Sequence, residues 1–164
     1  MYHKTIKDKL TSKGIKLINK DADTKIWQLA WGEINEDDTL KNIEATVKGH
    51  DTLKTWCTGA YDKSLSDKVN LDKTEKICSQ PALTISEKLN KKKKEFTKDW
   101  ATKLTAVKQE NNLIAKLKTI NNKLSKVEEN KDNQDALKGW CEKQLNVELT
   151  VEGTEYKEVE KLCV

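Results

Sequence analysis

The 164-residue sequence contains no arginine, only one proline and six glycines, and no long apolar run. All 31 basic residues are therefore lysines, which stand against 27 acidic residues and give a formal charge of +4. Arginine grips phosphates and stacks on bases through its planar guanidinium, so its absence weakens an interpretation as a nucleic-acid-binding protein. No segment reaches the roughly 18 apolar residues that span a bilayer, and no segment has the pattern expected of a signal peptide.

The composition is polar but not that of a disordered chain. Apolar and charged residues each make up 35% of the sequence, and five tryptophans accompany regularly spaced Leu, Ile and Val. The length suits one domain or two small ones. No glycine-rich phosphate loop, HExxH or GxSxG pattern occurs. We therefore expect a folded protein that is not an enzyme and that carries no cofactor.

Three short motifs recur in the same order along the chain. The pairs are TIKDKL at 5–10 and TISEKL at 84–89, LKTWC at 53–57 and LKGWC at 137–141, and EKIC at 75–78 and EKLC at 160–163. The members of these pairs lie 79, 84 and 85 residues apart. This order and near-constant spacing predict a tandem duplication with units at 1–80 and 81–164, joined near Pro81, the single proline.

Each unit has the pattern of a helical module. Thr5 with Asp8, and Thr84 with Glu87, have the form of a capping box, and Gly14 is placed to end the first helix. Apolar residues three and four apart predict further helices. These groups are Ile26, Trp27, Ala30 and Trp31; Leu40, Ile43 and Val47; and, in the second unit, Phe96, Trp100 and Leu104.

The middle of the second unit carries a longer apolar stripe. The stripe comprises Val107, Ile114, Leu117, Ile120, Leu124 and Val127. The Trp-to-Cys interval is 11 residues longer here than in the first unit, about three helical turns, so we expect a longer, projecting helix. Its apolar side could dock a partner helix, although a seam within the core is the more frequent use.

The last two helices of each unit carry the cysteines. We expect the first of these helices to start near Asp51 in one unit and near Asn133 or Asp135 in the other. The last helix should follow Asp72 and Thr154. Residues 147–151 alternate like a strand but have no obvious partner, so we expect an extended linker. The predicted fold class is all-α, with about four to five helices in each unit.

Four cysteines allow three pairings. The repeat favours Cys57–Cys78 and Cys141–Cys163, because each duplicated unit should close its own bridge. A loop of about 22 residues closed in this way stabilises a chain by about 3 kcal/mol in the chain-entropy model. Such bridges belong to oxidising, extracellular environments.

Other uses of the cysteines remain open at this stage. Structural zinc usually clips cysteines two to four residues apart, and only His3 and His50 could add imidazole, so a metal site is not expected. Buried free thiols are the stronger alternative, since cysteine packs well as a small hydrophobe. A catalytic thiol would need a base, and His50, seven residues before Cys57, has no counterpart in the second unit.

Two sets of residues are candidates for binding a partner. Trp27 and Trp31 stand four apart on one helix face, and only one of them has a match, Trp100, so the other is a candidate exposed anchor. The only basic block is a tetralysine segment, which could touch anionic lipid or polyanions but is more simply a solvated surface. It consists of Lys91, Lys92, Lys93 and Lys94. Trp56 and Trp140, which precede the first cysteines, are expected to pack over the bridges.

These motifs resemble a large family of paralogous, uncharacterised surface or secreted proteins of haemotropic mycoplasmas, which parasitise red blood cells. The resemblance lies in the Thr-Ile-x-Glu/Asp-Lys-Leu unit start, the Leu-Lys-x-Trp-Cys centre and a final helix with Tyr156, Val159 and Cys163. Family members carry a short N-terminal membrane or signal segment. That segment is not found here, and we expect it to have been removed from this chain. The lysine bias agrees with an A/T-rich genome.

The resemblance implies an extracellular or cell-surface protein, with paralogue diversity suited to adhesion, antigenic variation or immune evasion. We therefore expect a non-enzymatic protein whose partner is an unknown host protein or red-cell surface component. The alternative from another class is an intracellular nucleic-acid or polyanion binder that uses the tetralysine segment, with binding that collapses as salt rises.

Overall fold

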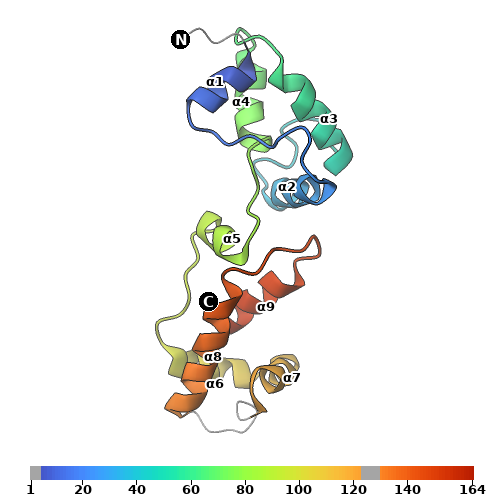
Figure 1. Ribbon diagram of the computed structural model, residues 1–164. Coiled ribbons are helices and arrows are strands. Elements are labelled where there is room, and N and C mark those ends of the chain that lie inside the picture. Colours follow the sequence, from blue (N-terminus) through green and yellow to red (C-terminus); the bar gives the residue numbers. More distant parts are fainter. Residues whose placement is uncertain (1–4, 123–129) are drawn as a thin grey trace. The chain divides into compact units, whose positions relative to one another are not determined.

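The computed structural model describes residues 5–122 and 130–164 (Figure 1). Within these residues the chain forms nine α-helices and no strands, only isolated β-bridges. The chain divides into two compact units, Met1–Ala82 and Leu83–Val164. The predicted all-α class, with one disulfide in each unit, is confirmed.

The helices differ in length but follow a common order. The first unit contains α1 (Ile6–Ser12), α2 (Thr24–Glu36), α3 (His50–Tyr61) and α4 (Lys68–Ile77). The second contains α5 (Ile85–Lys91), α6 (Trp100–Lys108), α7 (Asn111–Ile120), α8 (Lys131–Gln144) and α9 (Thr154–Cys163). In each unit the two cysteine-bearing helices, α3 with α4 and α8 with α9, are in contact.

The first helix of each unit begins at a threonine cap, as predicted. The Thr5 hydroxyl accepts a hydrogen bond from the Asp8 N–H, and the Thr84 hydroxyl accepts one from the Glu87 N–H, both at 3.2 Å. Each cap satisfies one of the backbone donors that a helix start leaves free. The Glu87 carboxylate accepts from the N–H of Leu83, one residue before the cap.

Both of these helices also end in the same way, with one residue in the left-handed region. That residue is Gly14 in the first unit (φ 82°) and Lys93 in the second (φ 55°). The N–H of the residue that follows then donates back to a leucine carbonyl, from Ile15 to Leu10 at 3.0 Å and from Lys94 to Leu89 at 2.9 Å. The turn is that of a helix C-terminus in which glycine is favoured.

Each unit has its own apolar core. In the first unit the buried cluster comprises Ile18, Trp27, Ala30, Ile34, Val47, Leu53, Cys57, Tyr61, Ile77 and Cys78. Buried residues of the second unit include Leu104, Val107, Leu113, Leu117, Leu137, Cys141, Tyr156, Val159, Leu162 and Cys163. Most of these residues come from helix faces with apolar positions three and four apart, as the periodicity predicted, whereas Ile18 and Val47 lie outside the helices.

The prediction of a helix around Leu40, Ile43 and Val47 is wrong. The segment forms successive turns, although Val47 is buried and the other two pack against the core. The Asp37 carboxylate accepts from the N–H and hydroxyl of Thr39 (2.9 and 2.6 Å). Such local side-chain bonds compete with helical backbone bonding and favour turns.

The prediction of a single long helix in the second unit is also wrong. The chain breaks after Lys108, and α7 starts at Asn111 and ends at Ile120. Helix α7 contacts both α6 and α8, with Leu113 and Leu117 buried, so the apolar stripe serves the core here. Leu124 and Val127 lie outside the described residues.

Among the four helices that carry the cysteines, three begin at positions that differ from the predicted ones and the fourth begins as predicted. Helix α4 begins one turn earlier than expected, capped by Asp67, and α8 begins at Lys131, capped by Asn130. Helix α3 begins one residue before Asp51, and α9 begins at Thr154 as predicted. Residues 147–151 form no strand, and Glu148 makes a single bridge to Thr84.

The two left-handed positions give a matched test. Lys93→Gly should stabilise the protein by about 0.5–1 kcal/mol, because glycine relieves the left-handed strain at a small entropic cost. Gly14→Ala should destabilise it by about 1 kcal/mol, although its Cβ would meet no atom within 4 Å. Urea unfolding measures both. Opposite signs are the expected result, and destabilisation by both substitutions would contradict this account.

A second test concerns Glu44, which joins the loop after α2 to α4. Hydrogen bonds from the Thr46 hydroxyl and N–H (2.8 and 3.1 Å), with Lys73 at 3.1 Å, lower the pKa of Glu44 from 4.5 to about 2. A lowered pKa contributes stability that is present above pH 4.5 and is lost as the pH falls towards 2.

Glu44→Gln should therefore lower the free energy of unfolding by about 1 kcal/mol at pH 7, and the difference from the native protein should vanish near pH 2. Urea midpoints at the two pH values measure this. Asp38→Asn, at an exposed position in the same loop, is the control and should change little. A difference that stays the same at both pH values would contradict the assignment.

Candidate functional site

The strongest chemical feature of each unit is its disulfide. Cys57 of α3 is bonded to Cys78 at the end of α4, and Cys141 of α8 is bonded to Cys163 of α9, with S–S distances of 2.05 and 2.02 Å. All four cysteines are fully buried and none is free. The predicted pairing is confirmed, so these cysteines are neither free thiols nor zinc ligands. Two such bridges indicate an oxidising environment outside the cytoplasm.

A backbone bond reinforces each bridge. The N–H of Ile18 donates to the Cys78 carbonyl at 2.9 Å, and the N–H of Thr97 donates to the Cys163 carbonyl at 2.8 Å. In both units the donor lies in the segment between the first two helices. Each second cysteine is thus held covalently by one helix and by hydrogen bonding to an early segment of the same unit.

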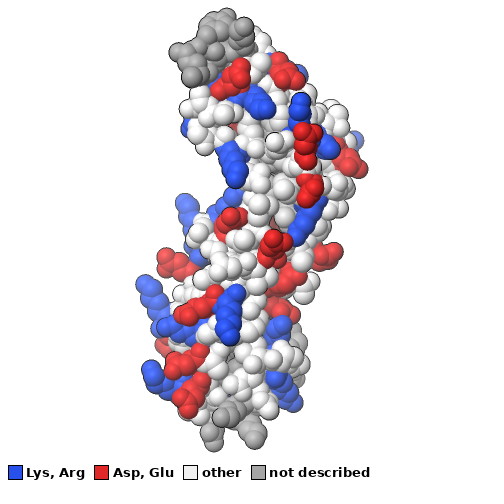
Figure 2. All heavy atoms as spheres, viewed as in Figure 1, with Lys and Arg blue, Asp and Glu red and all other residues white. Residues whose placement is uncertain are grey.

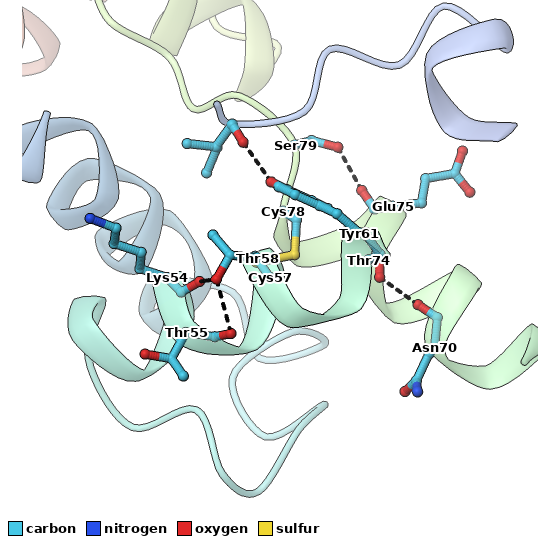
Figure 3. Close-up of a disulfide and its surroundings, with 11 residues drawn as sticks. Lys54, Thr55, Cys57, Thr58, Tyr61, Asn70, Thr74, Glu75, Cys78 and Ser79 are labelled. Carbon is cyan, nitrogen blue, oxygen red and sulfur yellow. Dashed lines mark hydrogen bonds between the residues drawn. A yellow bond between two sulfur atoms is a disulfide. The ribbon is translucent and has the colours of Figure 1, made fainter. Parts of the chain in front are cut away.

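The surroundings of the first bridge are closed by Tyr61 (Figure 3). Its hydroxyl donates to the Ile18 carbonyl at 2.6 Å, and burial raises its pKa above the ordinary value of 10. The hydroxyls of Thr74 and Ser79 donate to backbone carbonyls of α4, both at 2.6 Å. Because Tyr61 stays neutral and bonded, it acts as a structural tie rather than as a reactive group.

The tryptophan candidates separate on burial. Trp27 is only 1% exposed and lies in the core, so it is not an exposed anchor. Trp31 is half-buried and packs against the same core, and it keeps the only solvent-facing surface of the pair. Trp100 is the first residue of α6, whereas Leu104 and Val107 supply the buried positions of that helix. Trp56 and Trp140 are also only partly buried.

The tetralysine segment is exposed but has acidic and aromatic neighbours. Lys94 and Lys92 lie 2.9 and 3.9 Å from the Glu160 carboxylate, and Lys92 also lies 5.2 Å from the centre of the Tyr156 ring. Helix α9 supplies this acid. Part of the charge of this segment is therefore engaged by side chains of α9.

The histidines assemble no metal centre in the described ranges. His50 Nε2 lies 3.2 Å from Asp51 Oδ1, its immediate neighbour on α3. No group of three or more His, Cys, Asp or Glu side chains with metal-binding geometry occurs among residues 5–122 and 130–164. His3 lies outside the described residues.

The first unit contains a groove that the sequence patterns do not predict. The groove has a volume of about 350 Å³ and lies between α1 and the segment that follows it, with Tyr61 among its lining residues. Three exposed lysines line it, Lys7, Lys16 and Lys20. Residues 14–20 (GIKLINK) contain two of these lysines among apolar residues, but the local sequence does not indicate that this segment and α1 enclose a groove.

The disulfides give a direct prediction. Non-reducing tryptic mapping should find Cys57 linked to Cys78 and Cys141 linked to Cys163. Replacing one pair, with Cys57→Ser and Cys78→Ser, should lower the free energy of unfolding by about 3 kcal/mol, because the denatured chain regains the freedom of the closed loop. Cys141→Ser with Cys163→Ser is the matched variant. Links between the units, or free thiols in native material, would contradict the assignment.

Comparison with protein-family models, curated proteins and solved structures finds no match to this chain. The candidate sites are therefore assigned from the geometry of the described residues. No helix among those residues is long and apolar enough to cross a membrane. One disulfide fixes the frame of each unit, and the lysine-lined groove of the first unit is a concave feature that could receive a ligand.

Proposed function

We propose that the protein is a secreted or surface-exposed binding protein, without enzymatic activity, that contacts a host component of the red-cell surface or serum. The observation that carries this proposal is the buried disulfide at the same place in both units, since such bridges persist in oxidising surroundings. The resemblance to surface proteins of haemotropic mycoplasmas is the reason for seeking the partner on red blood cells or in serum. Adhesion, antigenic variation and immune evasion are the roles that this setting favours.

The surface supports a role in binding. On the face seen in Figure 2, basic and acidic side chains lie interspersed over each unit instead of forming one large patch of a single sign. Mixed charge of this kind favours recognition through particular local contacts over general attraction to polyanions. The groove of the first unit and the partly exposed Trp31 are the local features available for such contacts.

An intracellular polyanion binder is the less favoured alternative. Its main support is the tetralysine segment, and part of that charge is engaged by Glu160. The two disulfides also argue against a reducing compartment. Binding to RNA at low ionic strength that disappears as salt is raised would be the evidence for it.

The proposal is tested by labelling the oxidised protein and measuring its binding to washed red cells and to immobilised plasma proteins at 0.15 M salt. We expect saturable binding that unlabelled protein displaces. The same protein, reduced and alkylated at its four cysteines, should lose this binding, because the units would no longer be closed.

Two outcomes would overturn the proposal. One is the absence of saturable binding to red cells and to plasma proteins. The other is binding that survives reduction and instead falls in proportion to salt concentration, since that would indicate attraction to any polyanion by the lysine-rich chain.

A further inference from the structure

The groove of the first unit has two walls of different kinds. Helix α1 contributes Lys7 and Thr11, residues 14–20 contribute the other wall, and Tyr61 also lines the groove. Tyr61 is buried and hydrogen-bonded to Ile18, so this lining is fixed in place. A volume of about 350 Å³ is at the small end of the range for ligand sites and suits a few side chains of a partner.

The second wall contains a short extended segment around Leu17, one edge of which is unoccupied. Ser79 pairs with Leu17 in an isolated antiparallel bridge, in which the Lys16 carbonyl accepts from Gln80 and the Ile18 N–H donates to Cys78. Alternate residues of an extended strand direct their backbone groups to opposite edges. The N–H and carbonyl of Leu17 therefore face away from Ser79, and neither has a hydrogen-bond partner among the described residues.

The charge of the groove is of one sign. Lys7, Lys16 and Lys20 form no ion pair within the part of the chain that the structure describes, and no carboxylate is among the residues that line the groove. The lysines of the tetralysine segment differ in this respect, since two of them face Glu160. The groove thus holds three cations for which the described residues supply no acidic partner.

The corresponding segment of the second unit lacks these features. With the spacing of 79 residues that relates the unit starts, Ser86 stands where the first unit has Lys7, and Glu95 stands where it has Lys16. The hydrogen bond to the second cysteine is nevertheless kept, from Thr97 to Cys163. The frame requires this segment but not its lysines, so their collection in the first unit is not explained by folding.

We propose that the groove binds an extended acidic peptide segment of the partner, which adds a strand alongside Leu17 and places carboxylates against Lys7, Lys16 and Lys20. A peptide offers the backbone donor and acceptor that Leu17 requires, together with side chains that alternate between the groove and solvent. This proposal narrows the binding function proposed above to one class of partner and rests on it.

The test uses the full-length oxidised protein and a fluorescein-labelled hexapeptide of alternating glutamate and valine. Fluorescence anisotropy at 0.05 M salt should show saturable binding. Lys16→Gln with Lys20→Gln should weaken it about tenfold, whereas Lys54→Gln with Lys63→Gln, which removes the same charge from exposed α3 and its end, should change it less than twofold.

The pairing with Leu17 is tested by methylating the peptide's amides. Strand addition predicts that methylation at one parity of residues abolishes binding, because those N–H groups face Leu17, while methylation at the other parity is tolerated. Amide chemical-shift changes should centre on Leu17. Equal effects of the two methylated peptides, equal losses in the two lysine variants, or binding of a heparin tetrasaccharide without binding of the peptide would overturn the proposal.

Failure of this proposal and failure of the proposed function can be told apart. If the protein with Lys16→Gln and Lys20→Gln keeps full binding to red cells or plasma proteins, the host contact lies elsewhere and only the groove assignment falls. If the peptide binds in the groove but the native protein binds no host component, the groove assignment is supported and the proposed host interaction is wrong.

Discussion

Covalent closure of each unit is the constraint on which the structure depends. A unit of about 80 residues in which charged residues are as common as apolar ones buries a small core, and domains of this size are only marginally stable. A bridge across 21 or 22 residues contributes about 3 kcal/mol, a large share of the stability expected for such a unit. It joins the last two helices, whose apolar faces supply much of the core.

The second cysteine of each unit is also where separate parts of that unit meet. Its side chain is bonded to the preceding helix, and its carbonyl accepts from the segment that follows the first helix, from Ile18 or Thr97. The start of the first helix is likewise tied to the loop after the first cysteine-bearing helix, through Ile6 to Lys63 and Ile85 to Val147. Equivalent bonds in both units agree with the duplication that the sequence predicts.

The sequence was a good guide wherever one local signal dominated. Threonine caps and apolar residues three and four apart placed α1, α5 and α9, and the repeated motifs predicted the disulfide pairing. It failed where side chains compete with the backbone, as when the carboxylates of Asp37 and Glu44 bind nearby threonines and hold the chain in turns. It also failed at Trp27, whose burial depends on how α2 packs.

The groove was not predicted because it, too, depends on how distant parts of the chain pack. Lys7, Lys16 and Lys20 are far from a contiguous basic run, and they come together only because α1 turns back at Gly14 and the next residues extend to meet Ser79. The tetralysine segment, by contrast, is conspicuous in the sequence, yet it faces Glu160. A lysine's availability to a partner depends on whether the fold supplies an acid beside it, and this information is absent from the linear order of charges.

The two units show how one frame can carry different surfaces. The capping threonine, the bridge and the backbone bond to its second cysteine are common to both, while the segment between the first two helices is shorter in the second unit and has Glu95 in place of Lys16. Since stability rests on the shared contacts, substitutions at the exposed positions of this segment cost the fold little. The exposed surface of this segment can therefore change without loss of the closed unit, and the binding function proposed above requires that freedom.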